Sequence, residues 1–251
     1  MAVRTVFFDL YNTLAGFDPP REVIQSRAAA EFGIALTREG VDSGYQLADA
    51  FMAEQNAKLP VRRMGHQERE DFFARFEQLV LRGAGHEVDM ETAGRIWRQV
   101  RKQEYRLALF PDVVPGLAAV RAALSKACPG RSRGNGPPGS PVLAVISNIN
   151  STGPELCESL GLTGHVDFAV TSSEVGAEKP HPPIFQAVLH RAGVEPGEAV
   201  HVGDQLDSDI AGALDAGIRP ILMDRFNGHS GYTAHPRVTG MRELPAVLGQ
   251  M

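Results

Sequence analysis

The stretch Val3-Arg4-Thr5-Val6-Phe7-Phe8-Asp9-Leu10-Tyr11-Asn12-Thr13 decides the fold that we expect for this chain. Its apolar run, Val3–Leu10, has the length of one buried strand. The polar residues Tyr11-Asn12-Thr13 that follow are typical of a turn, and Asn12 tolerates the left-handed backbone that a tight turn often needs. The pattern therefore predicts a buried strand that ends in a polar turn.

The second half of the chain alternates short apolar runs with helical patterns. Further strands are expected at 142–146, 166–170, 199–202 and 218–223, and helices at 116–127, 154–160, 183–192 and 209–216. Alternation of this kind is the signature of βαβ units and a parallel sheet. We therefore expect an α/β fold with a Rossmann-like parallel sheet that includes the first strand.

The region between Phe17 and Leu107 is expected to contain helices and no strand. Its aromatic residues recur at helical spacing, which favours a helix core over a cofactor-binding surface. We therefore expect two domains: an α/β core from residues 1–15 and 107–251, and a helical domain, 16–106, inserted after the first strand. Residues 128–141 are rich in Gly, Pro and Ser and are expected to form a flexible loop within the core.

Composition excludes several classes of protein. The chain has 251 residues, 43% hydrophobic and 22% charged, which is ordinary for a globular protein. A net charge of −5 argues against electrostatic binding of nucleic acid, but a local cation can still attract a small anionic substrate. The apolar runs are too short to span a membrane. The two cysteines, Cys128 and Cys157, exclude a disulfide scaffold and fit the cytoplasm.

Polar residues follow four of the expected strands at their carboxyl ends, the edge at which ligands bind to a parallel sheet. In chain order they are Asp9, Ser147 with Asn148, Lys179, and Asp204 with Asp209. A carboxylate can act as a nucleophile toward phosphorus or activated carbon, and Mg²⁺ prefers carboxylate oxygens. A hydroxyl and an ammonium can hold the oxygens of a transferring phosphoryl group. Each residue alone commonly serves as a turn or cap residue, but together they indicate a catalytic site.

These motifs resemble those of the haloacid dehalogenase-like hydrolase superfamily. The matching stretches, in the order that the family has them, are Phe8–Leu14, Ile146–Asn148, Glu178–Pro182, His201–Ile210 and Ala211–Gly217. The pattern Gly-Asp-x-x-x-x-Asp at 203–209 is the most specific part. The helical insert resembles the cap domain of the family.

The resemblance implies a role for each matching residue. Asp9 would be the nucleophile, Ser147 would bind the transferred group, and Lys179 would offset negative charge. Mg²⁺ would be held by Asp9, the backbone carbonyl of Tyr11, Asp204 and Asp209. The residues expected to contact the substrate are Tyr11, Thr13 and Asn148.

Tyr11 departs from the pattern of the phosphatases in this family, which mostly have a second Asp at this position as general acid and base. A phenol with a pKa of about 10 is a poor base at neutral pH. The loss of such a group typically costs a factor of about 10²–10⁴ in rate. Tyrosine at this position resembles the dehalogenase branch, in which a departing halide needs no proton and no Mg²⁺ is required.

Three functions stay open. The first is a Mg²⁺-dependent phosphatase that acts on a small phosphorylated metabolite through a covalent intermediate on Asp9, and the Asp204–Asp209 pair favours it. The second is a metal-independent 2-haloacid dehalogenase-like hydrolase, which Tyr11 favours. The third is a weakly active relative that binds a ligand. We expect a cytoplasmic monomer or homodimer with a small anionic substrate and no nucleic-acid or membrane partner.

Overall fold

The computed structural model describes residues 3–127 and 141–251, and of Ala57 and Arg62 it describes the backbone only. The loop expected at 128–141 lies outside the described residues, apart from Pro141. The chain divides into two compact units. One comprises Met1–Gly16 with Ala108–Met251, and the other comprises Phe17–Leu107.

The first unit is built on a parallel sheet of six strands in the order β5-β4-β1-β6-β7-β8. The strands are β1 (Thr5–Phe8), β4 (Val142–Ser147), β5 (Phe168–Thr171), β6 (Ala199–Gly203), β7 (Arg219–Met223) and β8 (Arg237–Val238). The expected α/β fold with a parallel sheet and a helical insertion is confirmed. The strand β8 was not expected, because two residues are too short for an alternating pattern to be seen.

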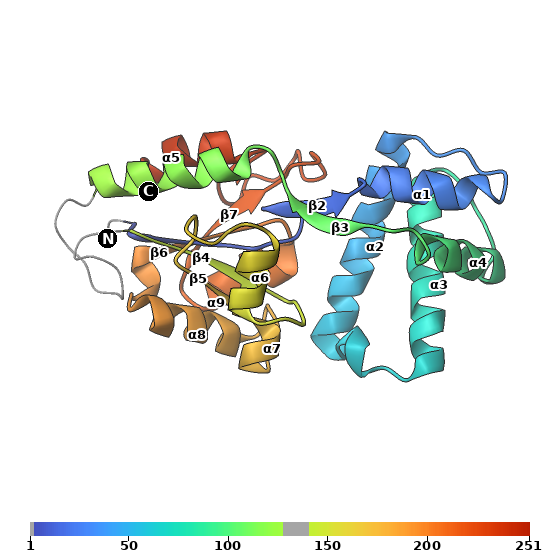
Figure 1. The fold of residues 1–251 in the computed structure, drawn as a ribbon, viewed down its shortest axis with the longest axis horizontal. Coiled ribbons are helices and arrows are strands. Elements are labelled where there is room, and N and C mark those ends of the chain that lie inside the picture. Colours follow the sequence, from blue (N-terminus) through green and yellow to red (C-terminus); the bar gives the residue numbers. More distant parts are fainter. Residues whose placement is uncertain (1–2, 128–140) are drawn as a thin grey trace. The chain divides into compact units, whose positions relative to one another are not determined.

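The strand β1 lies in the middle of the sheet and is covered on both faces. Phe7 and Phe8 are fully buried. Phe7 packs in one cluster with Ile184 and Phe185 of α8 (Pro182–Ala192). Helix α5 (Val113–Ala127) lies on the opposite side of the sheet from α8 (Figure 1). A strand between two helical layers has no face toward water, which explains its continuous apolar run.

The remaining helices of this unit are short. They are α6 (Gly153–Ser159), α7 (Ser172–Val175), α9 (Gly212–Asp215) and α10 (Leu244–Leu248), with single turns η2 (Pro196–Glu198) and η4 (Met241–Glu243). The helix expected at 209–216 begins instead as the π-helical turn η3 (Leu206–Ala211) and continues as α9.

The second unit is helical, as expected. It contains α1 (Arg21–Ala30), α2 (Arg38–Lys58), the turn η1 (Val61–Arg63), α3 (His66–Gly83) and α4 (Met90–Val100). Phe72 and Phe76 are buried in its core, and Phe73 stacks on Trp97 with ring centroids 4.5 Å apart. Helices α2 and α3 can approach closely because Gly44 has no side chain. A Cβ on Gly44 would lie 2.1 Å from the carbonyl oxygen of Val80.

The expectation that Phe17–Leu107 holds no strand is wrong at both ends. Strands β2 (Ala15–Asp18) and β3 (Arg106–Leu109) pair with each other as a separate two-stranded sheet. The helical insertion therefore follows β2 and not β1 directly. Each strand has only four residues, so neither carries an alternating pattern long enough to predict it.

The structure contains no membrane-spanning helix among its described residues, since none of these helices is both long and apolar enough.

A polar network lies inside the helical unit. Gln25 donates from Nε2 to Glu77 Oε2 at 3.1 Å and to Tyr45 Oη at 3.2 Å. Arg21 lies over the Tyr45 ring, 4.5 Å from its centroid, and pairs with Asp42 at 3.3 Å. Glu77 is fully buried, and burial raises its pKa to about 7 although the Gln25 hydrogen bond opposes this shift. A raised carboxyl pKa means that folding loses stability as the pH rises from about 4.5 through about 7.

We predict that Glu77→Gln stabilises the protein at pH 8.5 by about 1–3 kcal/mol, because the amide fills the same space without a buried charge. At pH 5.5 the gain shrinks, since wild-type Glu77 is then mostly protonated. Urea denaturation at both pH values measures the difference. The exposed Glu31→Gln is the control and should change little at either pH. An equal effect of Glu77→Gln at both pH values would contradict the prediction.

Candidate active site

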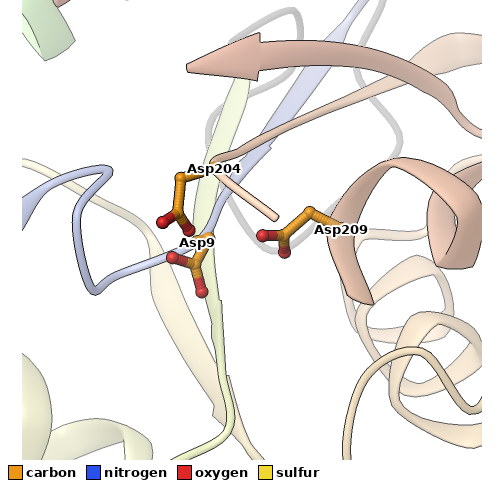
Figure 2. A group of neighbouring side chains, drawn as sticks. All are labelled: Asp9, Asp204 and Asp209. Atoms are coloured by element: carbon orange, nitrogen blue, oxygen red, sulfur yellow. The ribbon is translucent and has the colours of Figure 1, made fainter. Parts of the chain in front are cut away.

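The topology of the sheet brings Asp9 and Asp204 together. β1 and β6 are neighbouring parallel strands, so their carboxyl ends lie side by side at one edge of the sheet. Asp9 directly follows β1, and its backbone N–H donates to the Val202 carbonyl of β6 at 2.8 Å. Asp204 directly follows β6. Figure 2 shows their carboxylates facing each other and that of Asp209.

The ammonium group of Lys179 joins two of these carboxylates. Its Nζ lies 2.5 Å from Asp9 Oδ1 and 2.6 Å from Asp209 Oδ1. The Lys179 side chain is 3% exposed, so water screens neither ion pair. The four predicted residues Asp9, Lys179, Asp204 and Asp209 thus lie at one edge of the sheet, as the sequence motifs indicated.

Asp209 is held on both of its oxygens. Oδ1 also lies 2.9 Å from His201 Nε2, and Oδ2 accepts the Gln205 backbone N–H at 3.1 Å. Gly203 makes this approach possible, because a Cβ there would lie 2.2 Å from Asp209 Cγ. The glycine of the Gly-Asp motif therefore has a steric reason: it lets the Asp209 carboxylate reach Lys179.

Burial and charge set the protonation of the site. Burial raises the pKa of Asp9 to about 6, with the Lys179 ammonium opposing and Asp209 adding to the rise. Burial acts in the same direction on Asp209, but Lys179 and His201 outweigh it and hold the pKa of Asp209 below its usual range. Burial would lower the pKa of Lys179, yet the two carboxylates raise it above its usual value. Burial lowers the pKa of His201, which favours a neutral imidazole.

The acidic residues can hold a metal ion. One oxygen from each of Asp9, Asp204 and Asp209 lies within 4.8 Å of the other two. Hard carboxylate oxygens at such spacing are the donors that Mg²⁺ prefers. Asn12 donates from Nδ2 to Asp204 Oδ2 at 3.1 Å, which orients that carboxylate. The oxygens of Asp209 already accept bonds from the protein, so its contact with a cation is best made through water.

The turn after β1 has the backbone that its sequence predicted. Asn12 adopts a positive φ of 59°. The N–H groups of Leu14 and Ala15 both donate to the Leu10 carbonyl at 2.8 Å, which closes the turn. Tyr11 lies within this turn and pairs with Ala15 in a short bridge.

Thr13 is fully buried at the same turn, and its Oγ1 has no hydrogen-bond partner among the residues that the structure describes. Its carbonyl accepts Arg225 Nε at 2.8 Å. The Arg225 guanidinium also pairs with Asp112 at 3.0 Å and lies over Phe110, 4.4 Å from the ring centroid. Arg225, which lies just after β7, therefore anchors a turn that is far away from it in the chain.

Ser147 and Asn148 lie at the end of β4. Ser147 is buried and pairs in register with Thr171 of β5. Asn148 is exposed. Its side-chain amide accepts the backbone N–H of Lys179 and donates to the backbone carbonyl of the same residue. The roles given to Ser147, Tyr11, Thr13 and Asn148 toward a substrate stay predictions.

Sequence reasoning missed His201 and Arg225. The signal for His201 was present, because an imidazole inside the apolar run Ala199–Val202 must find a polar partner. No local signal marks Arg225, whose partners Thr13 and Asp112 are far away in the chain.

The comparisons with known proteins agree with this geometry. The family model for the haloacid dehalogenase-like hydrolases matches residues 3–217, so the chain belongs to this family of hydrolases. Human N-acylneuraminate-9-phosphatase is 27% identical over 98% of this chain and 94% of its own. The glyceraldehyde 3-phosphate phosphatase of Methanopyrus kandleri is 29% identical over 89% of this chain and 84% of its own.

Solved structures share the fold. The HAD-hydrolase YfnB from Bacillus subtilis, solved bound to magnesium, has a TM-score of 0.60 at 17% identity, with 99% of both chains covered. Solved phosphatases and 2-haloacid dehalogenases of the family both resemble the chain in this way. The likeness to these structures concerns the fold and does not separate the two activities.

We predict that Lys179→Met lowers the free energy of unfolding by about 3–5 kcal/mol at pH 7.5, because it leaves two buried carboxylates without their counter-charge. The deficit should shrink below pH 6, where protonation of Asp9 removes one of the charges. Denaturant titration measures it. The exposed Lys126→Met should change stability by no more than about 0.5 kcal/mol. Equal effects of the two substitutions would show that the ammonium does not balance the site.

Proposed function

We propose that this hydrolase is a Mg²⁺-dependent phosphatase that acts on a small phosphorylated metabolite through a covalent intermediate on Asp9. The observation that carries the proposal is the group of three carboxylates, Asp9, Asp204 and Asp209, two of which, Asp9 and Asp209, pair with the buried Lys179. Attack on a carbon–halogen bond needs only the nucleophile and its lysine. The additional carboxylate of Asp204 would repel Asp9 without a cation between them.

The two curated phosphatases support the same proposal, since they match over most of their own length and of this chain. We also propose that the substrate is anionic. The buried Lys179 ammonium and a divalent cation would then supply the positive charge that a net charge of −5 lacks.

In the first step, a carboxylate oxygen of Asp9 attacks phosphorus, and the bond between phosphorus and the leaving oxygen breaks. Lys179 holds Asp9 Oδ1 at 2.5 Å, which leaves Oδ2 as the attacking atom. The Lys179 ammonium and the Ser147 hydroxyl stabilise the charge on the phosphoryl oxygens. The ionised form of Asp9 is required, and it predominates above a pH of about 6.

The residues that would hold Mg²⁺ are Asp9, Asp204 and the backbone carbonyl of Tyr11, with Asp209 acting through water. When bound, the cation offsets the negative charge of the phosphoryl group and of the carboxylates. Asn12 orients Asp204, and Lys179 keeps Asp209 ionised.

In the second step, water attacks the phosphorus of the aspartyl phosphate, the bond to Asp9 breaks, and inorganic phosphate leaves. Tyr11 stands where most relatives have a second Asp, so no carboxylate at that position protonates the leaving oxygen or activates the water. The alcohol that leaves in the first step must then take its proton from solvent, and the attacking water must lose its proton to solvent in the second. We therefore propose slow turnover of esters with poor leaving groups.

A second function, metal-independent dehalogenation of 2-haloacids, is favoured by Tyr11 alone. In that reaction Asp9 would displace halide from carbon, and water would then hydrolyse the ester at Asp9. The halide needs no proton to depart, so Tyr11 would be no handicap.

A cytoplasmic location and a monomeric or homodimeric state remain part of our proposal.

Hydrolysis of p-nitrophenyl phosphate by the purified protein tests the main proposal. Nitrophenolate departs without a proton, so we expect turnover with Mg²⁺ and none in EDTA. Asp9→Asn should abolish it, because the amide cannot attack phosphorus. Asp207→Asn is the matched control: Asp207 lies on the same η3 turn but outside the group of three carboxylates, and its loss should leave the rate within about twofold.

Failure to hydrolyse this ester, together with halide release from 2-chloropropionate in EDTA, would overturn the phosphatase in favour of the dehalogenase. A burst of nitrophenolate that stops after one equivalent would show that Asp9 attacks but that water does not complete the cycle. Absence of both reactions would favour the weakly active ligand-binding protein.

Binding of Mg²⁺ should depend on pH. Because the pKa of Asp9 is raised to about 6, protons compete with the cation below that pH. We predict that the dissociation constant rises about fivefold between pH 6 and pH 5 and changes little between pH 7 and pH 8. Isothermal titration calorimetry measures it, with Asp204→Asn expected to weaken binding at every pH. An affinity independent of pH would show that Asp9 does not bind the metal.

A further inference from the structure

Asn148 makes a pair of hydrogen bonds that a substrate ligand would not need. Its Oδ1 accepts the backbone N–H of Lys179 at 2.7 Å, and its Nδ2 donates to the backbone carbonyl of Lys179 at 3.0 Å. The two residues are 31 positions apart and lie in different loops. The Asn148 side chain therefore holds both the N–H and the carbonyl of the Lys179 backbone.

The residue held in this way is the one whose ammonium joins Asp9 and Asp209. A lysine side chain has four rotatable bonds, so its ammonium can sit in one place only if its backbone is fixed as well. Lys179 lies in the loop between α7 and α8 and belongs to no helix or strand. The loop therefore lacks the ladder of hydrogen bonds that fixes Asp9 beside β6.

We infer that Asn148 is a positioning residue that holds the backbone of Lys179, and through it places the ammonium between Asp9 and Asp209. In this arrangement the loop after β4 contributes to the site through the amide of Asn148. This inference deepens the proposed function, and its kinetic part rests on that function. It differs from a role as substrate ligand, because both heteroatoms of the amide are engaged with Lys179.

Asn148→Ala tests the inference in two independent ways. The side chain is exposed, so its truncation opens no cavity in the core. Hydrogen exchange of the Lys179 amide, followed by NMR, needs no activity and no metal. We expect exchange to become about five- to tenfold faster, because the acceptor of this N–H has been removed.

Steady-state kinetics with p-nitrophenyl phosphate and Mg²⁺ give the second readout. We expect kcat to fall by about ten- to a hundredfold, since an ångström of misplacement at a reacting centre has an effect of this size. KM should stay within about twofold, because the substrate loses no contact. Asn150→Ala, an exposed amide two residues further along the same loop, is the control and should leave both readouts unchanged.

Unchanged exchange of the Lys179 amide in Asn148→Ala would overturn the inference. A raised KM with an unchanged kcat would overturn it as well, and would make Asn148 a substrate ligand. If the wild-type protein does not hydrolyse the ester, the proposed function fails, while the exchange measurement still decides whether Asn148 holds Lys179.

Discussion

The ammonium of Lys179, shared between Asp9 and Asp209, is the interaction on which the site depends. Two carboxylates as buried as these repel each other, and without a cation between them one would take up a proton. With the ammonium in place, Asp209 stays ionised and Asp9 titrates near pH 6. Asp9 is therefore a carboxylate at neutral pH, which a nucleophile must be.

The fold brings the charged groups of Asp9, Lys179 and Asp209 together from three different parts of the chain. Asp9 is held by the ladder between β1 and β6, whereas Lys179 comes from a loop and Asp209 from a π-helical turn. Each of the latter two is fixed by partners from other elements: the Asn148 amide for Lys179, and His201 with the Gln205 backbone for Asp209. Groups on regular strands need few such partners, because backbone pairing already orients them.

Tyr11 and Asp204 indicate different chemistries, and the neighbouring residues show which is better supported. Asn12 bonds to Asp204 and thereby ties the turn after β1 to the acidic group. This bond holds one of the three carboxylates that could bind a cation, which supports the metal-dependent reaction that we propose. Tyr11 leaves Asp9, Lys179 and the acidic group in place.

The sequence by itself determined the parallel sheet, the helical insertion and the set of residues at the strand ends, because a strand buried on both faces is apolar throughout and chemical groups follow its end. It did not reveal β2, β3 or β8, which are too short for a periodic pattern. Only the tertiary structure decided that Asn148 holds Lys179, that Arg225 anchors Thr13 and that His201 holds Asp209. The Asn148 and Arg225 contacts join loops far apart in the chain, and no local propensity encodes which partner a loop side chain will meet.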